Sequence, residues 1–348
     1  MRPEFSVPPK LGPGDRVAVL SPAYAAPADF PAVHEQGLRR LREMFELEPV
    51  EYPTTRRHSS AQARADDLMA AYADPDIRAV FATIGGDDQI TVLRHLDPKP
   101  FQADPKPFFG FSDNTNLLNW LWTHGVAGYH GMSTMMHLGR GAGVQPATAD
   151  SLRAALFTGG ELEIRAVDMF SDQELSWAEP ASLTESGPPY PSPGRVWHQA
   201  GGRVVTAPTW GGNLEILHWT LAADRWVRPV EDYAGCVLLL ETSEEMPPAD
   251  EVFRMLRNFG ERGLLEQFPA IVMGTAKASV FSAPRPIEER TRYREEQRAA
   301  VLRAVETYNP AALVVFGVDF GHTDPQWVLP YGGQVTVDGP ARAVTAHF

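Results

Sequence analysis

The first part of the chain alternates between short apolar runs and segments in which apolar residues recur every three or four positions. A short apolar run bounded by turn residues is typical of a buried strand, and the wider spacing is typical of an amphipathic helix. Strands and helices that alternate in this way form right-handed βαβ units around a mostly parallel sheet with helices on both faces. The pattern predicts strands over 16–22, 48–52, 78–84 and 107–111, and helices over 32–45, 61–74, 88–96 and 114–124.

Residues 159–200 differ in composition, because they are rich in Pro, Gly, Ser and acidic residues and have no sustained periodicity. Such a stretch indicates a linker or functional loop at a domain boundary. Residues 201–348 return to an α/β pattern and end in short strands, which predicts a mixed sheet. We therefore expect an N-terminal α/β domain (1–158), a Pro/Gly-rich linker or lid (159–200) and a C-terminal α/β domain (201–348). The expected elements of the last domain are strands over 236–241, 270–274 and 312–318, and helices over 249–260 and 286–306.

Composition excludes several classes of function. The net charge of -13 argues against nucleic acid as the main partner, because binding to phosphates needs a basic stripe. No apolar run approaches the roughly 20 residues that span a bilayer, and no apolar signal segment follows the N-terminal "MRPEF". We therefore expect a cytoplasmic protein that does not bind membranes. The single cysteine, Cys236, lies in the apolar run "CVLLLE" and is expected in the core.

Three apolar strands end abruptly in polar or glycine residues, in "VFATIGGDDQ", "FFGFSDNTN" and "CVLLLETSEE", and "FGVDFGHTDP" follows a fourth. Ligands of open α/β sheets bind beyond the carboxyl ends of the strands, so a site is expected there. Ser112 in the second stretch has two interpretations. It is either the N-cap of the following helix or a nucleophile. In the second case the amide of Asp113 could donate to the oxyanion that develops on the attacked carbonyl. The lipase-type G-x-S-x-G motif is not met, since position 114 is Asn.

The other strand ends offer the remaining parts of a hydrolytic site. Gly85 and Gly86 lack Cβ atoms and let a substrate approach their amides, although the same turn could simply start a helix. A serine needs a base, and His322, beside Gly321, is the best placed of the ten histidines. Glu241 ends a run of five apolar residues, where an acid is costly unless it is paired, so a histidine partner fits. Metal catalysis is the rival chemistry, but no H-E-x-x-H or C-x-x-C motif is present.

Six motifs in order resemble the LD-carboxypeptidase and microcin C immunity protein family of serine peptidases. They are "LGPGDRVAVLSPA", "TIGGDD", "GFSDNT", "GGNL", "LLLETSEE" and a "GH" ahead of "LPYGG". The resemblance implies a two-domain α/β enzyme with a Ser-Glu-His triad between the domains, no cofactor and no metal, and a homodimer. Carried over motif by motif, it makes Ser112 the nucleophile, Glu241 the acid and His322 the base. The oxyanion would be held by the amides of Asp113 and Gly86.

The same resemblance implies hydrolysis of a terminal amide through an acyl-enzyme and leaves two substrate classes open. LD-carboxypeptidases release a D-amino acid from a murein peptide, and microcin immunity proteins cleave the amide that joins a peptidyl or aminoacyl group to a modified nucleotide. Aromatic residues of the linker, which could stack on a base, favour the second class. An alternative of another kind is a catalytically silent protein that only binds a peptide or nucleotide conjugate. The candidate substrate contacts are Gly85, Arg140, Trp177, Tyr190, Arg195, Trp197 and Asn213.

Overall fold

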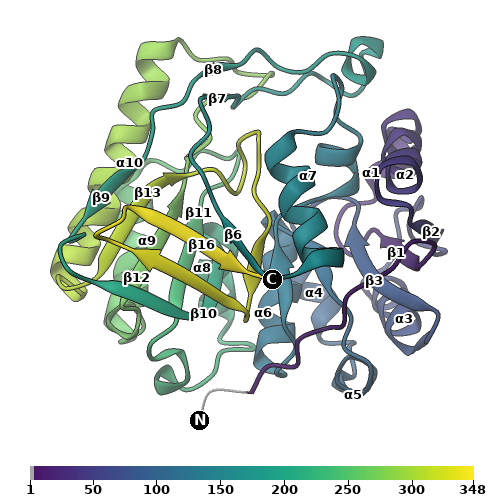
Figure 1. The fold of residues 1–348 in the computed structure, drawn as a ribbon, viewed down its shortest axis with the longest axis horizontal. Helices are drawn as coiled ribbons and strands as arrows, with labels where there is room; N and C mark the ends of the chain where they lie inside the picture. The colour runs from purple at the N-terminus through teal and green to yellow at the C-terminus, as the bar shows by residue number, and fades with distance from the viewer. Residues whose placement is uncertain (1–3) are drawn as a thin grey trace.

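The computed structural model describes residues 4–348, which form two large β-sheets flanked by helices (Figure 1). The first sheet has six strands in the order β14-β5-β4-β3-β1-β2, and all neighbours are parallel except β14 and β5. The mostly parallel N-terminal sheet that the sequence predicts is thus confirmed. Its strands are β1 (Arg16–Leu20), β2 (Glu48–Glu51), β3 (Ile77–Ala82), β4 (Phe108–Gly110), β5 (Gly128–His130) and β14 (Leu329–Tyr331).

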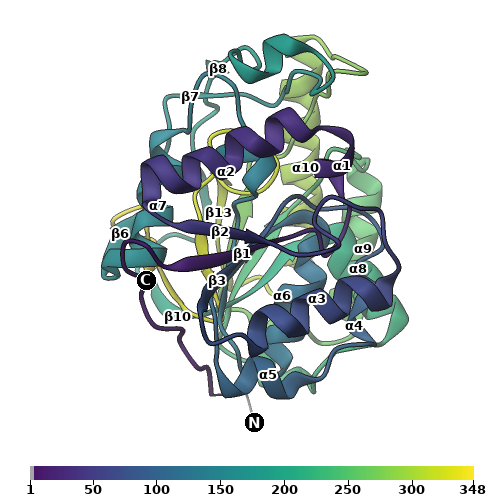
Figure 2. The ribbon, with the colours of Figure 1, turned by 90° about the vertical axis from the view of Figure 1, so that its right-hand side faces the viewer.

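Helices cover both faces of this sheet because side chains alternate along its strands. Val19 of β1 belongs to the same core as Leu38 of α2, whereas the neighbouring Leu20 belongs to the core that contains Leu68 of α3. Figure 2 shows α2 and α3 on opposite sides of β1. The helix expected over 88–96 is shorter, because the chain turns ahead of Pro98, where α5 begins. The helices are α1 (Ala26–Asp29), α2 (Pro31–Phe45), α3 (Ala61–Ala73), α4 (Ile90–Leu93), α5 (Pro98–Ala103), α6 (Thr115–Thr123) and α7 (Pro146–Arg153).

The second sheet is mixed, as the sequence predicts. Its eight strands follow the order β6-β16-β15-β10-β11-β12-β13-β9, with a parallel centre from β10 to β13 and antiparallel neighbours outside it. Three further helices, α8 (Leu214–Ala223), α9 (Ala249–Glu261) and α10 (Ile287–Tyr308), accompany this sheet. The strands are β6 (Glu161–Glu163), β9 (Val196–His198), β10 (Val204–Asn213), β11 (Val237–Glu241), β12 (Ala270–Gly274), β13 (Leu313–Val318), β15 (Gln334–Asp338) and β16 (Ala343–His347).

The segment 159–200 crosses one end of the molecule, where Figure 1 labels β7 (Met169–Phe170) and β8 (Tyr190–Pro191). It also contributes β6 and β9 to opposite edges of the second sheet. Contacts hold the segment to both halves of the chain, since Gln36 of α2 donates to the carbonyl of Leu183 (3.0 Å) and Arg290 of α10 pairs with Asp172 (2.8 Å). No helix within residues 4–348 combines the length and apolar character that crossing a membrane requires.

Helix α6 lies between the two halves of the molecule and is buried along almost its whole length. Its Trp122 stacks on Tyr233 with ring centroids 5.0 Å apart, and the indole of Trp210 in β10 donates to Asn119 Oδ1 at 2.9 Å. Buried aromatic rings contribute strongly to packing, and a buried indole N–H needs a partner of this kind. The turn that precedes α6 is therefore held firmly in place, and that turn carries Ser112.

Candidate active site

Ser112 follows β4 and has a left-handed backbone, with φ +61°. A non-glycine residue in this region costs about 1–3 kcal/mol, and such strain is concentrated at functional sites. Ser112 is not the cap of α6, because Asn114 occupies the N-cap position and no side chain caps the helix. The capping interpretation is therefore wrong. The strained turn instead exposes a hydroxyl at the carboxyl end of a parallel strand.

Hydrogen bonds join the Ser112 turn to the loop that follows β3. The backbone N–H of Gln89 donates to Asp113 Oδ2 at 2.9 Å, and the Gln89 side chain donates to Asn114 Oδ1 at 2.7 Å. Asn114 in turn donates to the carbonyl of Ile84 at 3.0 Å. These buried bonds compensate the strain at Ser112, because the turn cannot relax without breaking them.

Gly85 lies directly against the serine. A Cβ atom at Gly85 would be 2.8 Å from Ser112 Cβ and 2.9 Å from its Oγ, closer than carbon atoms approach in proteins. A Cβ at Gly86 would instead meet the backbone nitrogen of Tyr24 at 2.9 Å. Both glycines border the same cavity as Ser112 and His322. Of the two, Gly85 is the one whose missing side chain makes room for the hydroxyl.

Glu241 and His322 are in direct contact although 81 residues separate them. Glu241 is the last residue of β11 and is only 1% exposed, and its Oε2 lies 2.5 Å from His322 Nδ1. Gly321 permits this approach, since its φ is +91° and a Cβ there would lie 2.7 Å from Glu241 Cβ. The imidazole also packs edge-on against Phe111, with centroids 5.0 Å apart. Because Phe111 precedes Ser112, the contact brings the histidine beside the serine turn.

The charge of His322 is set by two carboxylates. Burial acts to lower the pKa of His322, but the negative charges of Glu241 and Glu244 outweigh it and raise the pKa to about 9, against the opposing charge of Lys277. Glu244 Oε2 lies 3.2 Å from His322 Nε2 as an ion pair, although the angle does not make a hydrogen bond. The two carboxylates therefore favour the protonated imidazole in the free protein.

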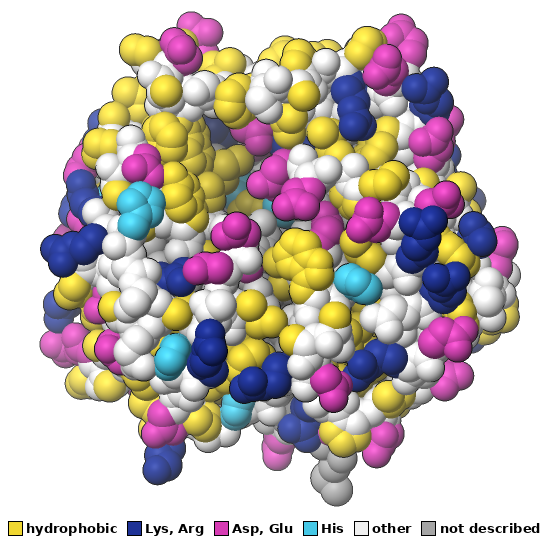
Figure 3. Space-filling view, turned by 180° about the vertical axis from the view of Figure 1, so that it is seen from behind, with side chains coloured by type: hydrophobic (Ala, Val, Ile, Leu, Met, Phe, Trp, Pro, Cys, Tyr) yellow, Lys and Arg dark blue, Asp and Glu magenta, His cyan; other side chains and the backbone are white. Residues whose placement is uncertain are grey.

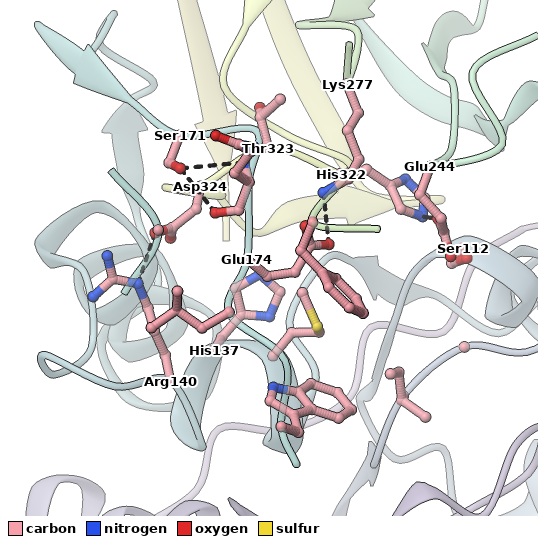
Figure 4. Close-up of a pocket in the computed structure, with 18 of the residues that line it drawn as sticks. Ser112, His137, Arg140, Ser171, Glu174, Glu244, Lys277, His322, Thr323 and Asp324 are labelled. Atoms are coloured by element: carbon pink, nitrogen blue, oxygen red, sulfur yellow. Dashed lines mark hydrogen bonds and ion pairs between the residues drawn. The ribbon is translucent and has the colours of Figure 1, made fainter. Parts of the chain in front are cut away.

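Ser112 and His322 border one cavity of about 630 Å³. Figure 4 places Ser112, Glu244 and His322 on one side of it, and Arg140 with Asp324 on the other. Figure 3 shows the hollow on the face seen from behind, with hydrophobic side chains on one side and acidic ones on the other. A cavity of this size suits a small-molecule or short peptide substrate. The aromatic side chains that border it are Tyr24, Phe30, Phe111, Trp177 and Phe281.

Two family models match the chain and settle its classification. The model described as the LD-carboxypeptidase N-terminal domain matches residues 17–131, and the one described as the LD-carboxypeptidase C-terminal domain matches residues 206–337. The chain belongs to the LD-carboxypeptidase family. The family expected from the six motifs is thus confirmed, and peptide-bond hydrolysis is the activity after which this family is named.

Individual relatives represent both branches of the LD-carboxypeptidase family. The microcin C7 self-immunity protein MccF of Escherichia coli is 25% identical over 81% of this chain and 77% of its own. The murein tetrapeptide carboxypeptidase of Pseudomonas aeruginosa is 34% identical over 38% of this chain and 43% of its own. The solved structure of MccF in complex with aspartyl sulfamoyl adenosine has a TM-score of 0.82 at 20% identity, over 99% of this chain and 98% of that one, which shows a shared fold.

The structure brings some of the expected substrate contacts of this family member to the cavity. Trp177 borders it, with its ring edge-on to Phe30 at 5.5 Å. Arg140 borders it as well and pairs with Asp324 at 2.6 Å. Asn213 lies beside Glu241 on the neighbouring strand, but it is 1% exposed and its Oδ1 accepts from the N–H of Ile216, so it caps α8.

Three expected contacts lie elsewhere, so their assignment to the substrate is corrected. Trp197 belongs to β9 and packs against the core of the second sheet. The guanidinium of Arg195 donates to the carbonyl of Ile164, and Tyr190 lies under the guanidinium of Arg290. The reason is the path of the 159–200 segment, because only its middle part reaches the cavity while its end pairs with β13.

Sequence reasoning missed several charged residues of the cavity, among them Glu244 and Lys277. Glu244 stands three positions after Glu241 within the quoted "LLLETSEE" motif, and Lys277 follows the end of β12. Lys277 is 3% exposed, and its Nζ lies 2.6 Å from Glu174 Oε1. The rule that sites lie beyond the carboxyl ends of parallel strands could have identified Lys277, since "AIVMGTAK" is such a strand end.

A buried histidine of the cavity wall gives a prediction for stability against pH. Burial lowers the pKa of His137 to about 4, whereas an unfolded histidine titrates near 6.5. Its contribution to stability is therefore present above pH 6.5 and is lost as the pH falls towards 4. Wild type and His137→Asn should differ in their free energy of unfolding. We expect this difference, measured with urea, to be about 2 kcal/mol smaller at pH 5 than at pH 7. A difference that does not change with pH would contradict this.

Proposed function

We propose that the protein is a serine hydrolase that cleaves a terminal amide bond through an acyl-enzyme on Ser112. The observation that carries the proposal is the 2.5 Å contact between Glu241 Oε2 and His322 Nδ1, next to a strained serine in the same cavity. A carboxylate on Nδ1 orients the imidazole and leaves Nε2 to face the serine. The proposed roles are nucleophile for Ser112, base and then acid for His322, and orienting acid for Glu241.

The reaction follows from these roles. Neutral His322 takes the proton of Ser112 as Oγ bonds to the scissile carbonyl carbon, and the protonated imidazole then gives that proton to the leaving nitrogen as the amide breaks. Water, deprotonated by His322, attacks the acyl-enzyme and restores the serine. The developing oxyanion would be held by the amide of Asp113, and by the glycine pair, in which the sequence favours Gly86. No metal or cofactor takes part in these steps.

For the substrate we propose a small peptide or an aminoacyl conjugate of a nucleotide, and we favour the conjugate. Structures of MccF are described in complex with aspartyl sulfamoyl adenosine, glutamyl sulfamoyl guanosine and adenosine monophosphate. The support in this chain is Trp177, whose half-buried ring borders the cavity and could stack on a base. The murein branch stays open, because its substrate is a peptide that the same cavity would admit.

Further proposals follow from the family. We propose that the protein acts in the cytoplasm as a homodimer. We also propose that residues 1–158 and 201–348 are domains that share the active site, joined by 159–200. The separation of Ser112 from Glu241 and His322 along the chain supports this division, because neither part alone holds the proposed triad.

The proposal is tested with an aryl phosphonate or sulfonyl fluoride probe. We expect the wild-type protein to be labelled at Ser112, as located by peptide mass spectrometry, and Ser112→Ala to remain unlabelled. Circular dichroism of Ser112→Ala controls for loss of the fold. If the wild type is not labelled, the catalytically silent binding protein becomes the better description.

To identify the substrate, the protein is incubated with an L,D-tetrapeptide and, separately, with aminoacyl sulfamoyl adenosines. Mass spectrometry then shows which compound is hydrolysed. We expect release of the amino acid from the sulfamoyl adenosine. Release of the terminal D-alanine from the tetrapeptide alone would place the protein in the murein branch instead.

A further inference from the structure

In the free protein, Nε2 of His322 faces a carboxylate. In the proposed mechanism this atom faces Ser112, yet Glu244 Oε2 lies 3.2 Å from it. The side chain of His322 is 8% exposed, and its Nε2 makes no hydrogen bond although it borders the cavity. Glu244 by contrast is 55% exposed on a loop and free to change its partner. The resting ion pair therefore occupies the atom that must act as the base.

The charges around the cavity show what could replace His322 as the partner of Glu244. Besides His322, the cavity is bordered by Arg140 and Lys277, which are already paired with Asp324 and Glu174 at 2.6 Å each. Among residues 4–348, three further carboxylates that border the cavity have no ion-pair partner, namely Asp87, Glu185 and Glu245, and Glu244 pairs only with His322. The cavity thus carries uncompensated negative charge close to the nucleophile. An acidic group would be repelled there, and an ammonium group would be attracted.

We propose that Glu244 binds an ammonium group of the substrate beside the scissile amide, and that this group replaces His322 as its partner. The inference rests on the proposed function and names the substrate class that this site prefers. The α-ammonium of an aminoacyl group is bonded to the carbon next to the scissile carbonyl. In the proposed mechanism His322 Nε2 acts next to the scissile carbonyl, so the carboxylate that lies 3.2 Å from Nε2 is close to where this ammonium would sit.

The change of partner at Glu244 alters the pKa of His322. Glu241 and Glu244 favour the protonated form of His322. Lys277, His130 and His137 also face His322, from other elements. Once Glu244 has turned to the substrate, the pKa of His322 falls, because one carboxylate is neutralised and a positive charge has entered the cavity. Substrates with the ammonium group therefore free the base that they need, and substrates without it do not.

The test compares labelling of Ser112 by diphenyl phosphonates that differ in one group. One probe carries a free α-ammonium and a neutral side chain, a second is its N-acetyl derivative, and a third is N-acetylated with a lysine side chain. We expect the first to react about tenfold faster than the second at pH 7, the effect of one charge-assisted hydrogen bond. Faster reaction of the third than of the first would assign the site to a side-chain ammonium.

Glu244→Gln should remove the preference by changing the two rates in opposite directions. We expect the ammonium probe to react more slowly, and the N-acetyl probe to react faster because His322 loses a proton more easily. Glu245→Gln is the matched control, since it removes the same charge from the next residue, and it should keep most of the preference. Equal rates for all probes in the wild type, or a preference that survives in Glu244→Gln, would overturn the inference. If no probe labels Ser112, the proposed function itself fails.

Discussion

Replacing Glu241 with glutamine is expected to lower kcat about 10⁴-fold with the fold intact. The carboxylate touches Nδ1 of His322 at 2.5 Å, and in the proposed mechanism it stabilises the imidazolium that forms as Ser112 loses its proton. A neutral amide cannot do this and can hold the ring in the wrong tautomer, which in the serine proteases costs about that factor. The measurement is kcat for hydrolysis of whichever conjugate or peptide proves to be the substrate.

The pH profile separates this role from a structural one. Because the negative charge of Glu241 helps to raise the pKa of His322 to about 9, wild-type kcat/KM should rise with pH towards that value. In Glu241→Gln the residual activity should rise at lower pH, since the histidine then loses its proton more easily. Glu266→Gln, an exposed change of the same kind, serves as the control. Wild-type turnover in Glu241→Gln would remove this residue from the proposed triad.

Gly85→Ala is expected to lower kcat/KM at least about 100-fold. The new Cβ would lie 2.8 Å from Ser112 Cβ and 2.9 Å from Oγ, so the serine turn must move. A displacement of about 1 Å at the reacting atoms costs about that factor. The loss should be matched by slower labelling of Ser112 with a phosphonate probe.

The control for Gly85→Ala is Gly201→Ala, because no atom lies within 4 Å of the added Cβ at that position. Overpacking at Gly85 should cost about 1–3 kcal/mol of stability, which urea unfolding measures. Activity equal to wild type in Gly85→Ala would mean that the turn tolerates the methyl group, and that Gly85 does not shape the space around the hydroxyl.

Much of the fold was predictable because its signals are local. The period of apolar residues identified β1, β3, β11 and β12 almost at their observed bounds, and it separated a parallel sheet from a mixed one. The ends of these strands also drew attention to the residues of the proposed triad. Strands bury alternate side chains, and helices bury every third or fourth one. Both leave a periodic pattern of apolar residues that can be recognised without a structure.

Predictions failed where the position of a residue depends on the path of the chain through the fold. Trp197 and Arg195 were expected at the substrate because they stand in an irregular segment, but that segment runs on to form β9 against β13. The strand-end rule could have placed Lys277 at the site, but its contact with Glu174 joins residues 103 positions apart. No spacing in the sequence encodes such a meeting, since it depends on how whole elements pack.

Short motifs and the periodic burial of side chains were enough to identify the α/β class, the family, and Ser112, Glu241 and His322 as candidates. The folded chain was needed to show that Ser112 is strained rather than a helix cap, and that Glu244 pairs with His322. Backbone strain and the charge of a buried histidine depend on neighbours brought together by packing. The direction of a pKa shift is therefore a property of the folded cavity, and the preference proposed for an ammonium group could be inferred only there.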